Sequence, residues 1–137
     1  MNKVILLIED NPDDGELALR AIGKSATNAV LINAHDGTEA LNLLFGLGEN
    51  GGCDASSVPH LILLDLNMPR MDGRRVLAMV KNDVQLRRIP VVILSSSQND
   101  TDILAAYELQ ANCYITKPVR PEQLLAHVRL LLGEGSV

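Results

Sequence analysis

Residues 61–67 read LILLDLN, four large apolar residues followed by an aspartate, a leucine and an asparagine. Because the run does not alternate with polar residues, it predicts a strand buried on both faces, as in the parallel sheets of α/β proteins. Residues 5–10 read ILLIED and show the same pattern, again with acidic residues directly after the apolar run. In all, five short apolar runs are candidate strands: residues 4–8, 29–34, 61–64, 91–94 and 113–116.

Helical patterns separate these candidate strands. Apolar residues recur three and four positions apart, as at Leu17 and Ala21. Asp36 followed by Glu39 predicts a capping box at the start of the second helix, and Pro121 suits the first turn of the last helix. Five β-α units in 137 residues favour an open, doubly wound, five-stranded parallel sheet, because a barrel of eight such units needs about 250 residues.

Length and composition limit the class of protein. The 137 residues are close to the length of one domain, about 150 residues. Seventeen acidic and twelve basic side chains give a net charge of −5, which disfavours binding to nucleic acid. No apolar stretch approaches the ~20 residues of a membrane span and no signal-peptide pattern is present, so we expect a cytoplasmic protein without a membrane partner. Two cysteines, Cys53 and Cys113, are too few for a disulfide scaffold or a zinc site.

Polar side chains follow four of the five predicted strands. Glu9 and Asp10 come after the first, Asp65 after the third, Ser95 after the fourth and Lys117 after the fifth. In an open α/β sheet, ligands bind beyond the carboxyl ends of the strands. We therefore expect three carboxylates, a hydroxyl and an amine to converge at one edge of the sheet.

This collection of charges predicts a bound cation. Two carboxylates about 5 Å apart repel by roughly 3 kcal/mol at an effective dielectric constant near 20. A hard divalent ion with oxygen ligands relieves the repulsion, and Mg²⁺ fits better than zinc because neither His nor Cys lies at these strand ends. A carboxylate beside such an ion is suited to attack a phosphoryl group and form an aspartyl phosphate.

The ordered set of motifs resembles the receiver domain of two-component response regulators. These motifs are residues 8–10 (IED), 64–69 (LDLNMP), 71–73 (MDG), 94–96 (LSS) and 116–118 (TKP). The resemblance covers residues 3–132 and implies the flavodoxin-like (βα)5 fold of that family. Within the family, residues 86–90 (LRRIP) and 107–114 (YELQANCY) resemble stand-alone regulators that partner bacterial phytochromes.

The resemblance implies roles for the acidic residues. Asp65 would accept the phosphoryl group from a phosphohistidine of a sensor histidine kinase. Asp10, Asp65 and the backbone carbonyl of Asn67 would hold Mg²⁺, with Glu9 acting largely through bound water.

The resemblance also implies a switch. Ser95 and Lys117 would each bond a phosphoryl oxygen. Tyr114 occupies the aromatic switch position, and its side chain would turn inward when the hydroxyl of Ser95 moves towards the phosphoryl group.

On this interpretation residues 1–137 form a single receiver domain with no fused effector, and the protein is a phosphoacceptor rather than an enzyme with its own substrate.

Three alternatives remain at this point. A haloacid-dehalogenase-type phosphohydrolase would need an aspartate as acid/base where Asn67 stands. A flavodoxin-like redox carrier would bring a flavin phosphate against acidic residues such as Asp13 and Asp14. A docking-only pseudo-receiver would not need the complete acceptor pocket.

The fourth predicted helix has more apolar residues than one buried face requires. Ile103 and Tyr107 lie four positions apart, and we expect both to be exposed. With Tyr114 they predict an interface for a homodimer or a downstream protein. The same helix is expected to turn four residues towards the core: Leu104, Ala105, Ala106 and Leu109.

Overall fold

The structure, a computed structural model, describes residues 3–23, 29–45, 59–66, 73–96, 100–117 and 119–132. All five predicted strands are present, and three of them extend one residue beyond the predicted bounds. The elements are β1 (Lys3–Ile8), α1 (Pro12–Gly23), β2 (Ala29–Ala34), α2 (Gly37–Phe45), β3 (Leu61–Asp65), α3 (Gly73–Asn82), the 3-10 helix η1 (Leu86–Arg88), β4 (Val91–Ser95), α4 (Asp100–Glu108), β5 (Cys113–Thr116) and α5 (Pro121–Leu132).

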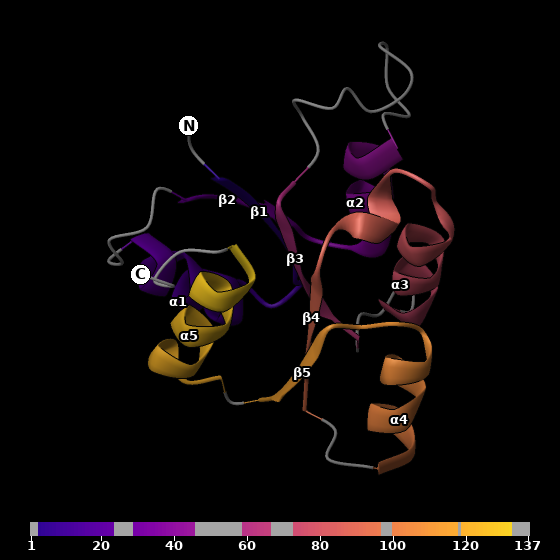
Figure 1. The fold of residues 1–137 in the computed structure, drawn as a ribbon. Coiled ribbons are helices and arrows are strands. Elements are labelled where there is room, and N and C mark those ends of the chain that lie inside the picture. The colour runs from indigo at the N-terminus through magenta and orange to yellow at the C-terminus, as the bar shows by residue number, and fades with distance from the viewer. Residues whose placement is uncertain are drawn as a thin grey trace.

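The strands form one parallel sheet in the order β2-β1-β3-β4-β5. Helices α1 and α5 cover one face, and α2, α3 and α4 cover the other (Figure 1). The predicted doubly wound α/β sheet is therefore confirmed. Because the strand order reverses between β1 and β3, a crevice at their carboxyl ends is the expected ligand site of this topology.

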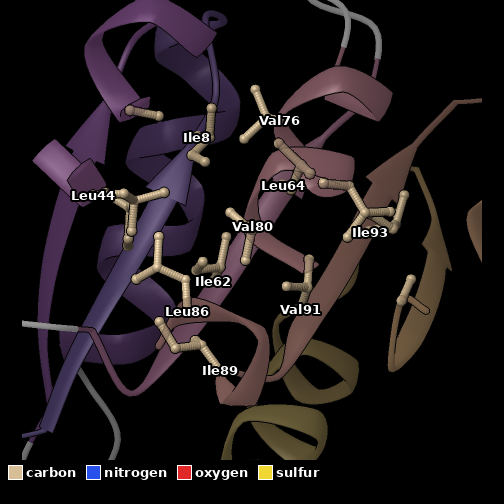
Figure 2. Close-up of a cluster of buried hydrophobic side chains, with 14 of the residues drawn as sticks. Ile8, Leu44, Ile62, Leu64, Val76, Val80, Leu86, Ile89, Val91 and Ile93 are labelled. Atoms are coloured by element: carbon tan, nitrogen blue, oxygen red, sulfur yellow. The ribbon is translucent and has the colours of Figure 1, made fainter. Parts of the chain in front are cut away.

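Both faces of the sheet are apolar, which explains why its strands do not alternate in polarity. In β1, Ile5 and Leu7 join a cluster with residues of α1 and α5, whereas Leu6 and Ile8 join a second cluster with residues of α2 and α3. Figure 2 shows the second cluster, in which Ile8 lies among aliphatic side chains of the neighbouring elements. Each fully buried Leu or Ile contributes about 1.5–3 kcal/mol relative to an exposed one. Among the described residues, the fully buried part of the core is aliphatic.

The helix starts follow the predicted chemistry. Asp36 accepts a hydrogen bond from the backbone N–H of Glu39 (2.7 Å), and Glu39 accepts one from the N–H of His35 (3.3 Å). The predicted capping box is confirmed, with its return bond one residue before the cap. Helix α5 begins at Pro121, as predicted.

Helix α4 is rotated differently from the prediction. Ala106 is 1% exposed, and Ile103 and Leu109, each three residues away, are half-buried on the same side. Leu104, expected in the core, is 60% exposed, and it lies three residues from Tyr107, which is 46% exposed. The exposed pair is therefore Leu104 and Tyr107 rather than Ile103 and Tyr107. The prediction was wrong because apolar residues on several sides of this helix leave its rotation undetermined.

The described segments contain no helix with the length and apolar character needed to cross a bilayer. Cys113 is a free, half-buried cysteine. Cys53 lies outside the described residues.

Candidate functional site

The carboxyl edge of the sheet positions the predicted site residues. Asp65 and Ser95 are the last residues of β3 and β4. Glu9 follows β1 directly, and its N–H donates to the carbonyl of Ala34 at 2.9 Å, which continues the β1–β2 pairing. The N–H of Lys117 donates to the carbonyl of Ser95 at 2.7 Å. Main-chain pairing therefore fixes where these side chains leave the sheet.

Helix α1 begins close to this edge. The Asn11 side chain caps the helix, with its Oδ1 atom accepting the N–H groups of Asp13 (2.9 Å) and Asp14 (3.3 Å). Pro12 occupies the first helical position, where a missing N–H costs nothing. The capping residue is also bonded to the site, because the N–H of Asn11 donates to Glu9 Oε2 at 3.3 Å.

Lys117 is the centre of the charge cluster. Its Nζ atom lies 2.8 Å from Glu9 Oε1, 3.0 Å from Asp14 Oδ2 and 3.3 Å from Asp65 Oδ2. These contacts join the residue that follows β5 to β1, to β3 and to the first turn of α1. One ammonium group thus contacts three carboxylates.

The buried part of the cluster carries excess negative charge. The side chains of Glu9 and Asp65 are 1% and 5% exposed. Burial is the largest cause that raises the pKa of Glu9, the contact with Asp65 also raises it, and Lys117 lowers it, so that the resulting pKa is about 7. Burial would lower the pKa of Lys117, but its hydrogen bonds to Glu9 and Asp14 and the charge of Asp65 raise the pKa above its ordinary value. The lysine stays protonated, and Glu9 loses its proton near neutral pH, where the carboxylate charges of the cluster then outnumber the ammonium charge.

The oxygen atoms suit a divalent cation. Glu9, Asp10 and Asp65 each offer a carboxylate oxygen, and these atoms lie within 4.8 Å of one another. Opposite ligands of one Mg²⁺ are about 4.2 Å apart, so small side-chain rotations or a bridging water bring them to one ion. Glu9 and Asp65 are buried and Asp10 is exposed, which leaves one side of the cluster open to solvent. These residues therefore fit a divalent cation.

A glycine keeps the backbone behind the Asp65 carboxylate in place. A Cβ atom on Gly73 would lie 2.5 Å from the carbonyl oxygen of Asp65 and 2.6 Å from Cα of Leu66. The N–H of Gly73 donates to the carbonyl of Leu66 at 3.2 Å. Only a residue without a side chain allows α3 to start this close to the end of β3.

The structure brings together Glu9, Asp10, Asp65 and Lys117, as predicted. Ser95 is 1% exposed at the end of the neighbouring strand. Asn67 lies outside the described residues.

Tyr114 is half-buried on β5 and packs against the apolar cluster that contains Ala106 of α4. Its predicted role as a switch remains a prediction.

The contact of Asp14 with Lys117 was not predicted from the sequence, which suggested only that Asp14 would repel a flavin phosphate. A signal was present in the dipeptide Asn11-Pro12, because an Asn before a Pro at the start of a helical pattern is typical of a cap. Recognising this cap would have placed Asp14 in the first turn of α1, at the same edge of the sheet as the predicted site.

A family model described as the response regulator receiver domain matches residues 5–129. The chain belongs to this family. The predicted resemblance is thereby confirmed, and the phosphohydrolase and redox-carrier alternatives are set aside. As a receiver domain of two-component signalling, the chain is part of a signalling protein rather than a classical enzyme.

Regulators linked by name to phytochromes are among the similar proteins. Response regulator Rcp1 from Synechocystis sp. is 47% identical to this chain over 115 residues, which cover 84% of this chain and 76% of Rcp1. The crystal structure of Mn²⁺-bound Rcp1 has a TM-score of 0.81 at 41% identity and covers 98% of this chain and 96% of that chain. The crystal structure of the phosphorylated cyanobacterial phytochrome response regulator RcpA has a TM-score of 0.80 at 44% identity, covering 97% and 91%.

Proposed function

We propose that Asp65 is the phosphoacceptor of this receiver domain. Its carboxylate is 5% exposed, ends a central strand and lies beside both the Lys117 ammonium and the oxygen atoms of Glu9 and Asp10. The observation that carries the proposal is the position of this buried carboxylate, which contacts a lysine on one side and lies among carboxylates that could hold a cation on the other. RcpA, 44% identical to this chain, has been crystallised in its phosphorylated form.

The reaction needs one bond to form and one to break. A carboxylate oxygen of Asp65 supplies the electron pair for a new bond to phosphorus. The bond from phosphorus to the donor breaks, and its electron pair stays on the leaving group, either an acetate oxygen or a ring nitrogen of phosphohistidine that then takes a proton from water. Lys117, 3.3 Å from Asp65 Oδ2, is placed to bind a phosphoryl oxygen in the product.

The cation is Mg²⁺ in this proposal, held by Asp10, Asp65 and Asn67, with Glu9 acting through water. Bound Mg²⁺ supplies positive charge that allows an anionic donor to approach the carboxylates. The three carboxylates supply hard oxygen ligands, and a Mn²⁺-bound form of the relative Rcp1 supports a divalent ion at this place.

In this proposal, Ser95 and Tyr114 change position when the phosphoryl group is present. It adds a charge of about −1.5 to −2 and three acceptor oxygens, which favour movement of the Ser95 hydroxyl towards it. Ser95 ends β4, and Tyr114 lies on the adjacent strand β5, paired in register with Ile93. Movement of the β4 end therefore changes the space available to the tyrosine.

The proposed partners are of two kinds. One is a sensor histidine kinase of the phytochrome class, and the other is a second copy of the chain or a target protein, whose binding responds to phosphorylation. The first rests on the names of the relatives, which include phytochrome response regulators. The second is a dimer or target interface made by Tyr114 with the exposed Leu104 and Tyr107, beside the half-buried Ile103. We further propose that the receiver domain acts in the cytoplasm through these contacts.

Acetyl phosphate tests the acceptor directly. Intact-mass measurement should show one phosphoryl group on the wild type with Mg²⁺, none in EDTA and none on Asp65→Asn. Equal labelling of Asp65→Asn would place the acceptor elsewhere, and full labelling in EDTA would remove the cation from the proposal.

Sedimentation tests the interface. With beryllofluoride, a phosphoryl mimic, the wild type should associate more strongly, and Tyr107→Glu should not. Leu130→Glu is the control, because Leu130 is 75% exposed on α5. If the wild type sediments as a monomer in every condition, or Tyr107→Glu associates as the wild type does, this face is not the dimer contact.

A further inference from the structure

Asp14 makes a contact that the acceptor chemistry does not require. Its Oδ2 atom accepts a hydrogen bond from Lys117 Nζ at 3.0 Å. It lies outside the cation cluster of Glu9, Asp10 and Asp65, and its side chain is 45% exposed whereas that of Glu9 is 1% exposed. Asp14 therefore adds negative charge at the rim of the site and directs it at the lysine.

The position of Asp14 is fixed by the fold. Its backbone N–H donates to the capping Asn11 side chain at 3.3 Å. The next residue, Gly15, packs so closely on β2 that a Cβ atom there would lie 2.9 Å from Asn33 Nδ2. The first turn of α1 thus holds the carboxylate against Lys117.

All three protons of the lysine are already engaged. An ammonium group has three donors, and Lys117 has three acceptors, at 2.8 Å on Glu9, 3.0 Å on Asp14 and 3.3 Å on Asp65. A phosphoryl group on Asp65 brings new oxygens and a charge of about −1.5 to −2. To bind one of them fully, Lys117 has to release an acceptor that it holds now.

Once Asp65 carries the phosphoryl group, the other two acceptors of Lys117 are Glu9 and Asp14, and Asp14 is the easier of the two to release. Water can solvate its half-exposed carboxylate, whereas Glu9 is buried and would be left without its cation. Lys117 also has space to move, because Lys117, Asp14 and Glu9 line a cavity of about 140 Å³ whose other walls are mainly apolar. The exchange is therefore between Asp14 and a phosphoryl oxygen.

We propose that Asp14 is a positioning residue that competes with the phosphoryl group for Lys117. By holding the ammonium in the unmodified protein, it weakens the phosphorylated state relative to the state without phosphate. The inference rests on the proposed function of Asp65 and adds a residue that sets how tightly the pocket holds a phosphoryl group.

Beryllofluoride binding at saturating Mg²⁺ tests this competition. Asp14→Asn should bind the mimic about fivefold more tightly than the wild type, which corresponds to about 1 kcal/mol, the upper value for one partly exposed ion pair. Fluorine NMR reports the bound fraction directly. Without beryllofluoride, Asp14→Asn should bind Mg²⁺ more weakly because negative charge has been removed. These opposite changes cannot come from a general loss of stability.

Asp13→Asn is the matched control. Asp13 lies in the same helical turn and loses the same charge, but it is exposed and is not an acceptor of Lys117. It should bind beryllofluoride nearly as the wild type does, Asp14→Glu should restore wild-type binding, and Asp14→Ala should repeat the effect of Asp14→Asn.

The outcomes separate the two proposals. If wild-type protein neither binds beryllofluoride nor accepts phosphate, the proposed function is wrong and the inference with it. If the wild type binds but Asp14→Asn binds no more tightly than Asp13→Asn, the proposed function stands and the competition is refuted.

Discussion

Two lysines at opposite ends of the sheet each donate to three oxygen atoms, but the oxygens differ in charge. At the carboxyl end, Lys117 contacts three carboxylates. At the amino end, Lys81 donates to the carbonyls of Ile89 (3.0 Å) and Arg87 (3.3 Å) and to the Asn112 side chain (3.3 Å). The acceptors of Lys117 carry negative charge in excess of its own, whereas the acceptors of Lys81 are neutral dipoles.

The contacts of Lys81 connect the end of α3 with the amino ends of β4 and β5. Asn112 Oδ1 also accepts the N–H of Val91 at 2.9 Å, and the N–H of Asn112 donates to the carbonyl of Val91 at 2.9 Å. The side chain thereby extends the β4–β5 pairing by one step, and Lys81 ties it to the end of α3. The three described acceptors of Lys81 are uncharged, so there is no carboxylate repulsion that a bound ion would have to relieve.

The pKa values express the same difference. The pKa of Lys81 is lowered by burial, while the pKa of Lys117 is raised because its carboxylate partners outweigh burial. A group of excess carboxylates is costly for folding unless a cation joins it. We infer that the carboxyl end is arranged for binding and the amino end for stability.

The largest expected effect is that of Lys117→Met, which keeps most of the side-chain volume and removes the charge. Glu9 and Asp65 then share a buried region without their ammonium partner, and breaking such a pair costs about 3–5 kcal/mol. Urea unfolding in EDTA measures the loss, and added Mg²⁺ should restore part of it. A loss below 1 kcal/mol would mean that the lysine does not stabilise the carboxylates.

Lys81→Met is the corresponding change at the amino end, with a smaller expected effect. It leaves neutral acceptors, two of whose three contacts are exposed to water, and it also removes a partly desolvated charge. We expect a loss of about 1 kcal/mol in the same urea experiment. Mg²⁺ should not restore it, and a restoration equal to that of Lys117→Met would contradict the proposed difference between the two ends.

The smallest expected effect is in the titration of the two lysines, followed by NMR of their side chains in Mg²⁺-free protein. The folded pKa of Lys81 lies below the unfolded value, so the unfolded chain binds more protons between the two values and stability from this group rises with pH. For Lys117 the folded pKa is raised, so its contribution is present below the unfolded value and is lost as pH rises through the folded pKa. Lys81 should lose its proton first, and the reverse order would contradict the comparison.

The fold was predictable because its strongest signals are local. Unbroken aliphatic runs such as residues 61–64 belong in a buried parallel strand whatever their neighbours are, and all five strands appeared within one residue of the predicted bounds. The burial of Ala106 was predicted, but the exposure of Leu104 and the partial burial of Ile103 were not, because the rotation of α4 is decided by the surface against which the helix packs.

The site was predictable where topology alone brings residues together. Parallel strands end at one edge, so Glu9, Asp10, Asp65 and Lys117 could be grouped from their positions after the strands. The contact of Asp14 depends on the start of α1 and on the direction of the Lys117 side chain. Periodicity and strand order do not determine either of these.

The most direct test of the excess charge at the carboxyl end is the free energy of unfolding of wild type and Asp65→Asn, each with and without Mg²⁺. At about 100 times its dissociation constant, a ligand that binds only the folded state adds about 2.7 kcal/mol. We predict this gain for the wild type and little of it for Asp65→Asn. We also predict that Asp65→Asn is the more stable of the two in EDTA, because one repelling carboxylate is gone. A wild type that does not respond to Mg²⁺, or an Asp65→Asn variant that is less stable in EDTA, would contradict the account.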